Sequence, residues 1–63
     1  MIEVLVSKEI GGNLEEIMFE KKEFSHLEDV EGYDTKFKLW LRNGTIYYVD
    51  GYREDLLNRF RKS

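Results

Sequence analysis

The chain has 63 residues, a formal net charge of −3 and no cysteine, which excludes disulfide bonds and thiolate zinc sites within it. This length predicts one domain, residues 1–63, that buries only about 60% of the surface its unfolded form exposes, so its stability should be marginal. No apolar run is long enough to span a membrane and no signal peptide is visible, so we expect a cytoplasmic protein without membrane contact.

The first predicted element is a strand over residues 2–9, in which apolar residues alternate with others. Gly11 and Gly12 indicate a two-residue loop, after which residues 14–20 return as an antiparallel strand. This loop would place three pairs opposite each other: Lys8 and Glu15, Val6 and Ile17, and Val4 and Phe19. Matched apolar and charged partners favour this hairpin.

A helix over residues 14–23 is the competing interpretation. Asn13 can serve as an N-cap with Glu16 at the third helical position, and Leu14, Ile17 and Met18 then share one face. We favour the strand, because two adjacent glycines between apolar runs are typical of a hairpin loop.

Residues 21–35 show the least regular pattern. Phe24, Leu27 and Val30 are spaced by three, which suits a short helical turn or a bent edge segment, and Gly32 interrupts the pattern. This part of the chain also holds a candidate acidic patch, made of Glu28, Asp29, Glu31 and Asp34. Its spacing does not follow a calcium-binding loop, so we expect a solvated acidic loop and no metal.

The strongest signal is a hairpin over residues 36–49 with Asn43-Gly44 as a type I′ turn. A two-residue turn pairs Trp40 with Tyr47, and alternation along the strands then defines two faces. The predicted core face carries Phe37, Leu39, Leu41, Ile46 and Tyr48. The other face, the predicted basic–aromatic face, is our candidate binding surface and carries Lys36, Lys38, Trp40, Arg42, Tyr47 and Val49.

A helix is predicted from Asp50 or Gly51 to the end of the chain. Tyr52, Leu56 and Phe60 recur every four residues and form its apolar stripe, which should pack on the core face of the hairpin. The fold class is therefore α+β: a small antiparallel β-sheet of two hairpins, about four strands, with one C-terminal helix packed on one face.

Residues 27–60 resemble two families in pattern. Leu27-Glu28-Asp29-Val30-Glu31, followed by residues 38–49 around Asn43-Gly44 and then a short helix, is similar to the core of small FlbD-type flagellar proteins. The same order is similar to the first half of LytTR DNA-binding domains. Both resemblances imply a strand, a tight turn, a second strand and a helix, and neither assigns a functional residue.

No catalytic residue is predicted. His26 is the only histidine. Its neighbour Ser25 would point to the opposite side of a strand, so the His26 imidazole could not activate the Ser25 hydroxyl as a base. The sequence also lacks a glycine-rich phosphate loop. We therefore expect a protein that is not an enzyme and that needs no cofactor.

Two functions remain in competition. Residues 1–34 hold ten acidic side chains against three lysines, a net charge of −7, whereas residues 35–63 carry a net charge of +4. The first hypothesis is a non-enzymatic protein-binding module, a small regulator or inhibitor of a larger protein, by analogy with phage and plasmid effectors. Because so short a chain without disulfides gains stability from self-association or a bound partner, we also expect a homodimer. The alternative is a nucleic-acid-binding regulator that uses the basic–aromatic face, although overall acidity disfavours phosphate contact.

Overall fold

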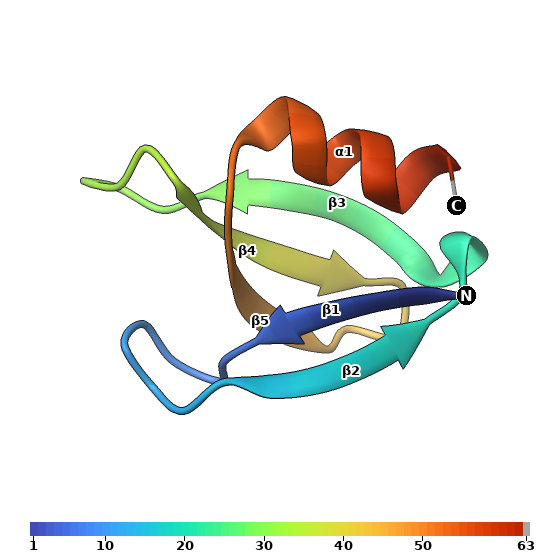
Figure 1. Ribbon diagram of the computed structural model, residues 1–63, viewed down its shortest axis with the longest axis horizontal. Coiled ribbons are helices and arrows are strands. Elements are labelled where there is room, and N and C mark those ends of the chain that lie inside the picture. The colour runs from blue at the N-terminus through green and yellow to red at the C-terminus, as the bar shows by residue number, and fades with distance from the viewer. Residues whose placement is uncertain (63) are drawn as a thin grey trace.

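The structure is a computed structural model that describes residues 1–62 and confirms the α+β class. Two antiparallel sheets and a C-terminal helix make up the fold (Figure 1). The strands are β1 (Ile2–Val6), β2 (Glu15–Phe19), β3 (Phe24–Asp29), β4 (Lys36–Leu41) and β5 (Ile46–Asp50); a 3₁₀ turn, η1 (Lys21–Glu23), and a helix, α1 (Arg53–Lys62), complete the set. Within residues 1–62 there is no helix of the length and apolarity that crossing a membrane requires.

The β1–β2 hairpin confirms the strand interpretation of residues 14–20, and the helical alternative is wrong. Its register differs from the predicted one by two residues, because Val4 pairs with Ile17 and not with Phe19. The turn is centred one residue earlier than Gly11-Gly12: the Gly12 N–H donates to the Glu9 carbonyl at 3.0 Å, and Gly11 has a φ of 76°. A shift of two residues leaves the same side chains facing the core.

The segment predicted to be irregular contains β3, so the sheet system has five strands and not four. Phe24 pairs with Leu41 and Leu27 with Leu39, and a bulge lies between Phe24 and His26. The extra residue converts the usual spacing of two between inward side chains into a spacing of three. Phe24 and Leu27 are therefore both buried on one side of a strand.

The β4–β5 hairpin has a different turn from the predicted one. The Gly44 N–H donates to the Leu41 carbonyl at 3.0 Å, and the Leu41 N–H donates to the Thr45 carbonyl at 3.0 Å. Gly44 has a φ of 91°, while no residue other than glycine has a positive φ in residues 1–62. This is a three-residue loop, a type I turn followed by a left-handed glycine, in place of the two-residue type I′ turn.

The longer loop moves the register by one residue, so the predicted faces of β5 are wrong. Tyr47 pairs with Leu39 and Val49 with Phe37. Val49 is therefore core, at 2% exposed, whereas Ile46 lies on the outer side at 38%. A slip of one residue exchanges the two faces of a strand.

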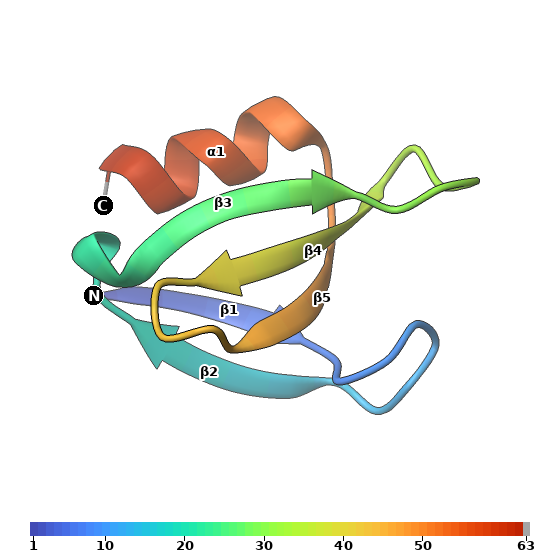
Figure 2. The same cartoon turned by 180° about the vertical axis from the view of Figure 1, so that it is seen from behind.

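The two sheets are joined by one β-bridge between β1 and β5. The Ser7 N–H donates to the Tyr48 carbonyl at 2.9 Å, and the Tyr48 N–H donates to the Ser7 carbonyl at 2.8 Å. The strands thus follow one another in the order β2-β1-β5-β4-β3. The sheet curls around the core, and α1 lies alongside β3 (Figure 2).

Helix α1 supplies the centre of the core. The Phe60 ring lies 5.5 Å from that of Phe19 and 5.4 Å from that of Phe24, so it links the two sheets. The helix starts at Arg53, later than predicted, and Tyr52 is 70% exposed, outside the buried stripe. Within residues 1–62 the core consists of twelve buried apolar residues: Ile2, Val4, Val6, Phe19, Phe24, Leu27, Phe37, Leu39, Leu41, Val49, Leu56 and Phe60.

Candidate functional site

The predicted basic–aromatic face is only partly assembled. Lys36, Lys38 and Trp40 share the outer side of β4, as strand alternation requires. Tyr47 and Val49 point to the core side, and Arg42 lies in the turn, where its backbone N–H donates to the Glu23 carbonyl at 2.8 Å. The residues that actually surround the three are His26 and Glu28 of β3 and Ile46, Tyr48 and Asp50 of β5, and we call this whole set the β4 face.

Trp40 is engaged inside the molecule. Its indole Nε1–H donates to the Glu28 carboxylate at 2.8 Å, and the His26 ring stacks on it with 5.4 Å between ring centroids and an interplanar angle of 13°. One face of the indole is therefore covered, and its only hydrogen-bond donor is used. Trp40 is half-buried on the outer side of the sheet and is not part of the core.

The lysines of the β4 face have acidic neighbours. Lys36 Nζ lies 2.9 Å from Asp50 Oδ1 and 5.9 Å from the centre of the Tyr33 ring. Lys38 lies opposite Glu28 in the β3–β4 ladder. Asp50 and Glu28 therefore offset the positive charge of the two lysines on the β4 face.

The four residues of the candidate acidic patch do not form one surface, because only Glu28 and Asp29 lie on β3 and they point to opposite sides of it. Glu28 faces outwards and accepts the Trp40 hydrogen bond, while Asp29 Oδ1 lies 3.1 Å from Arg53 Nη1 of α1. Glu31 and Asp34 are exposed on the turn that joins β3 to β4. Across residues 1–62 no group of three or more acidic, histidine or cysteine side chains is placed to hold a metal ion.

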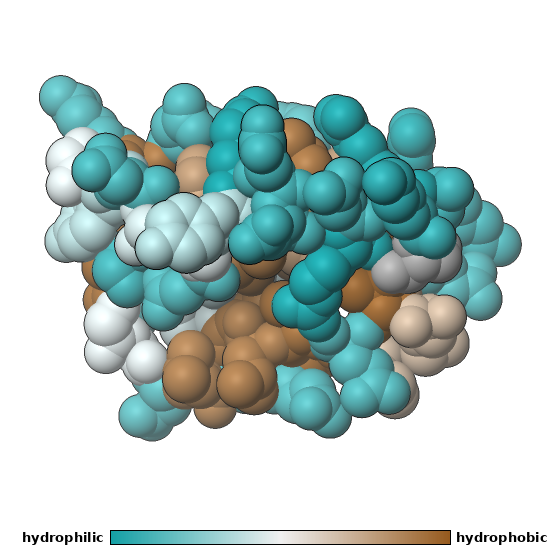
Figure 3. Space-filling model, turned by 45° about the horizontal axis from the view of Figure 1, so that its top comes forward, coloured by the Kyte–Doolittle hydropathy of each residue, from teal (hydrophilic) through white to brown (hydrophobic). Residues whose placement is uncertain are grey.

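A second surface was not singled out from the sequence. Leu5, Leu14 and Met18 lie on the outer side of the β1–β2 hairpin and are 56%, 63% and 61% exposed. We call these three residues the apolar face. Strand alternation already placed Leu5 and Met18 together, away from the core, so the signal was present in the sequence. Figure 3 shows hydrophobic side chains gathered in one exposed area with hydrophilic ones around it.

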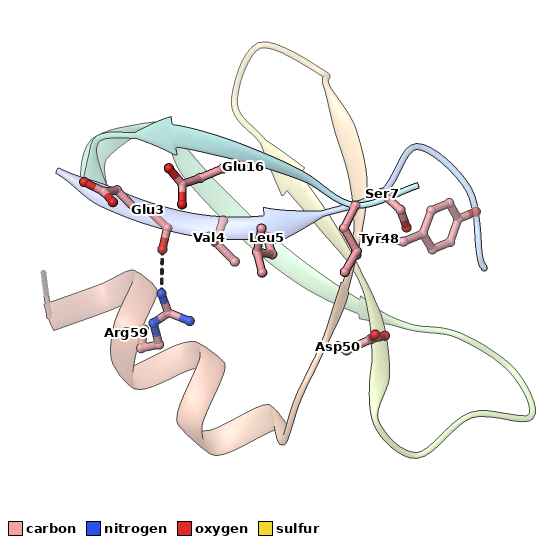
Figure 4. Close-up of a pocket in the computed structure, with 9 residues that line it drawn as sticks. Glu3, Val4, Leu5, Ser7, Glu16, Tyr48, Asp50 and Arg59 are labelled. Atoms are coloured by element: carbon pink, nitrogen blue, oxygen red, sulfur yellow. Dashed lines mark hydrogen bonds between the residues drawn. The ribbon is translucent and has the colours of Figure 1, made fainter. Parts of the chain in front are cut away.

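A hollow of about 600 Å³ adjoins the apolar face where β1 and β5 separate (Figure 4). The guanidinium of Arg59 reaches across from α1 and donates to the backbone carbonyl of Glu3. The residues that line the hollow are Glu3, Val4, Leu5, Ser7, Leu14, Glu16, Tyr48, Asp50 and Arg59. Four separate elements or their flanking segments supply this lining, and sequence spacing alone does not bring them together.

Comparison with known proteins adds no functional information to this geometry. No protein-family model, curated protein or solved structure matches the chain. The resemblance to FlbD-type proteins and LytTR domains therefore stays one of pattern and carries no functional argument.

Proposed function

We propose that this chain is a cytoplasmic, non-enzymatic protein-binding module, a small regulator or inhibitor of a larger protein, and that it binds through the apolar face. The observation that carries the proposal is the exposure of Leu5, Leu14 and Met18, each more than half exposed, on one side of one hairpin. Burying a leucine or methionine side chain against a partner is worth about 1.5–3 kcal/mol.

The three side chains of the apolar face are neighbours. Leu5 lies opposite Glu16 and Met18 lies opposite Glu3, so Leu5 and Met18 are diagonal neighbours in the ladder. Leu5 and Leu14 both line the adjoining hollow. Glu3 and Glu16 alternate with Leu5 and Met18 on this side of the hairpin, so a partner that covers the apolar face also meets these two carboxylates.

The nucleic-acid alternative has less support from the geometry. The β4 face mixes Lys36 and Lys38 with Glu28 and Asp50, and its indole is stacked against His26. Non-specific binding of nucleic acid depends on uncompensated positive charge, and stacking of bases depends on open aromatic faces.

Photo-cross-linking in cells of the source organism tests the proposal. A photoreactive amino acid replaces Met18 in one variant and Asn58, exposed on α1, in the control variant. We expect a specific product from position 18 that position 58 does not give. The cross-linked protein is then purified and its binding to the wild-type chain is measured by calorimetry.

The decisive step is the effect of Met18→Glu on that reconstituted binding. A charge within the apolar face should weaken the affinity by about tenfold, as loss of a central apolar contact does, while Asn58→Glu should leave it unchanged. Equal affinities of both variants would overturn the proposal. A product of twice the mass of this chain would assign the face to a homodimer, and quenching of Trp40 by single-stranded DNA would revive the nucleic-acid alternative.

A further inference from the structure

An open strand edge runs along one side of the hollow. Both backbone groups of Ser7 bond to Tyr48, so they point away from β2 and towards β5. Backbone groups two residues apart in a strand point to the same edge, which places those of Glu3 and Leu5 on this side. Arg59 takes the Glu3 carbonyl, whereas the N–H and C=O of Leu5 have no bond to another element in residues 1–62.

The edge is open because β5 leaves β1 after one bridge. The Gly51 N–H donates to the Thr35 carbonyl at 2.9 Å, which keeps the end of β5 on β4. The φ of 145° at Gly51 then redirects the chain into α1. Asp50, which would face Leu5 in a continued ladder, remains across the hollow from it (Figure 4).

The side chains around this edge favour a basic, partly apolar ligand. Leu5, Leu14 and Tyr48 give the hollow apolar walls, and its carboxylates come from Glu3, Glu16 and Asp50, of which Asp50 is already paired with Lys36 at 2.9 Å. The guanidinium of Arg59, the one cation in the lining, donates to the neutral Glu3 carbonyl and keeps its charge, and the carboxylates of Glu3 and Glu16 outnumber it. A volume of about 600 Å³ lies within the range of known ligand pockets, about 300–1,000 Å³.

We propose that this hollow binds a short extended peptide segment with a lysine or arginine side chain, and that the segment pairs with the open edge of β1 at Leu5. The inference rests on the proposed function and states what the protein partner presents. Addition of an extended segment to a free strand edge is an established mode of peptide recognition. A second copy of this chain fits less well, because its other hairpin edge, at β2, carries Glu15 and Glu16 and would repel the carboxylates of the hollow.

The test is an NMR titration of the full ¹⁵N-labelled chain with three peptides. The probe is acetyl-Thr-Val-Lys-Val-Thr-amide, the second peptide has glutamate in place of lysine, and the third has N-methyl groups on its three central residues. We expect the lysine peptide to shift the amide signals of Leu5, Glu16 and Asp50 and to slow hydrogen exchange at Leu5. The glutamate peptide should not bind, and the N-methylated peptide should not protect Leu5.

Charge variants supply the matched control. Glu16→Lys should weaken binding of the lysine peptide by about threefold, the size of an exposed ion pair, and should allow the glutamate peptide to bind. Glu31→Lys makes the same change of charge on the β3–β4 turn, outside the hollow, and should change neither. Equal effects of the two variants would overturn the inference by showing that only net charge matters.

The inference and the proposed function fail in different ways. Absence of any shift at Leu5, while a partner still binds and is sensitive to Met18→Glu, would overturn the peptide inference alone. Binding of the lysine peptide at the hollow, with a partner insensitive to Met18→Glu, would overturn the apolar face and keep the peptide site.

Discussion

Phe60 is the side chain of α1 that packs against both sheets. It is fully buried and its ring contacts both Phe19 and Phe24. We predict that Phe60→Ala lowers the free energy of unfolding by about 3–5 kcal/mol, because it leaves a cavity at the centre of the core. Urea denaturation followed by circular dichroism measures the loss, which is a large part of the total stability of so small a domain.

Tyr52 provides the matched control for Phe60. Both belong to the stripe that the sequence pattern predicted, but Tyr52 precedes the helix and is largely exposed. Tyr52→Ala should therefore change the free energy of unfolding by no more than about 0.5 kcal/mol. Similar losses for the two variants would show that the helix begins earlier and buries the whole stripe.

His26 controls access to the only tryptophan. Its ring stacks on Trp40, and its Nδ1 lies 2.9 Å from the Ser25 hydroxyl, so the expectation that Ser25 points away from the imidazole is wrong. We predict that His26→Ala increases quenching of Trp40 fluorescence by acrylamide and lowers the free energy of unfolding by less than about 1 kcal/mol, because His26 is exposed. Unchanged quenching would mean that His26 does not cover the indole in solution.

Among the elements, the β4–β5 hairpin shows which side chains a sequence pattern can assign to a face of the sheet and which it cannot. Lys36, Lys38 and Trp40 could be placed on one face because they belong to a single strand. Tyr47 and Val49 could not, because their side depends on whether the loop has two residues or three. Asn43-Gly44 is compatible with both loops, and a difference of one residue exchanges the faces of β5.

Strand β3 was predicted only as one of two alternatives, a bent edge segment or a short helical turn, for a related reason. Its bulge gives Phe24 and Leu27 the spacing of a helical turn, although both lie in a strand. A period-two search cannot detect a strand that contains an extra residue. The hollow was beyond prediction, because it depends on β5 leaving β1 at Gly51 and on a side chain from α1.

The connection between β5 and α1 requires glycine at position 51. A Cβ atom there would lie 3.3 Å from two carbon atoms of the Leu56 side chain, at a φ of 145°. We predict that Gly51→Ala lowers the free energy of unfolding by about 2–3 kcal/mol, from backbone strain and displacement of a buried leucine. Thermal and urea denaturation measure the loss.

The variant Gly44→Ala separates the cost of backbone strain from the cost of displacing a buried side chain. Gly44 also has a positive φ, of 91°, but a Cβ atom there meets nothing within 4 Å. Its loss should be about 1 kcal/mol, the cost of the left-handed backbone alone. A loss at position 51 no larger than at position 44 would contradict the contact with Leu56.

For the molecule as a whole, the two differently charged halves of the chain are interleaved by the fold. Acidic β3 lies beside basic β4, and Asp29 pairs with Arg53 of α1 at 3.1 Å. The charge division in the sequence therefore becomes internal charge pairing between β3 and the elements beside it, β4 and α1. The apolar face of the β1–β2 hairpin has no such internal partner, which is why the proposed function is assigned to it.

The measurement that tests this account most directly is one NMR spectrum of the complex with the partner identified by cross-linking. The chain carries ¹³C-methyl methionine and ¹⁵N-indole tryptophan, so Met18 reports on the apolar face and Trp40 on the β4 face. We predict that the partner shifts or broadens the Met18 methyl signal and leaves the Trp40 indole signal unchanged. A shifted Trp40 indole signal beside an unchanged Met18 methyl signal would contradict the account and return the function to the β4 face.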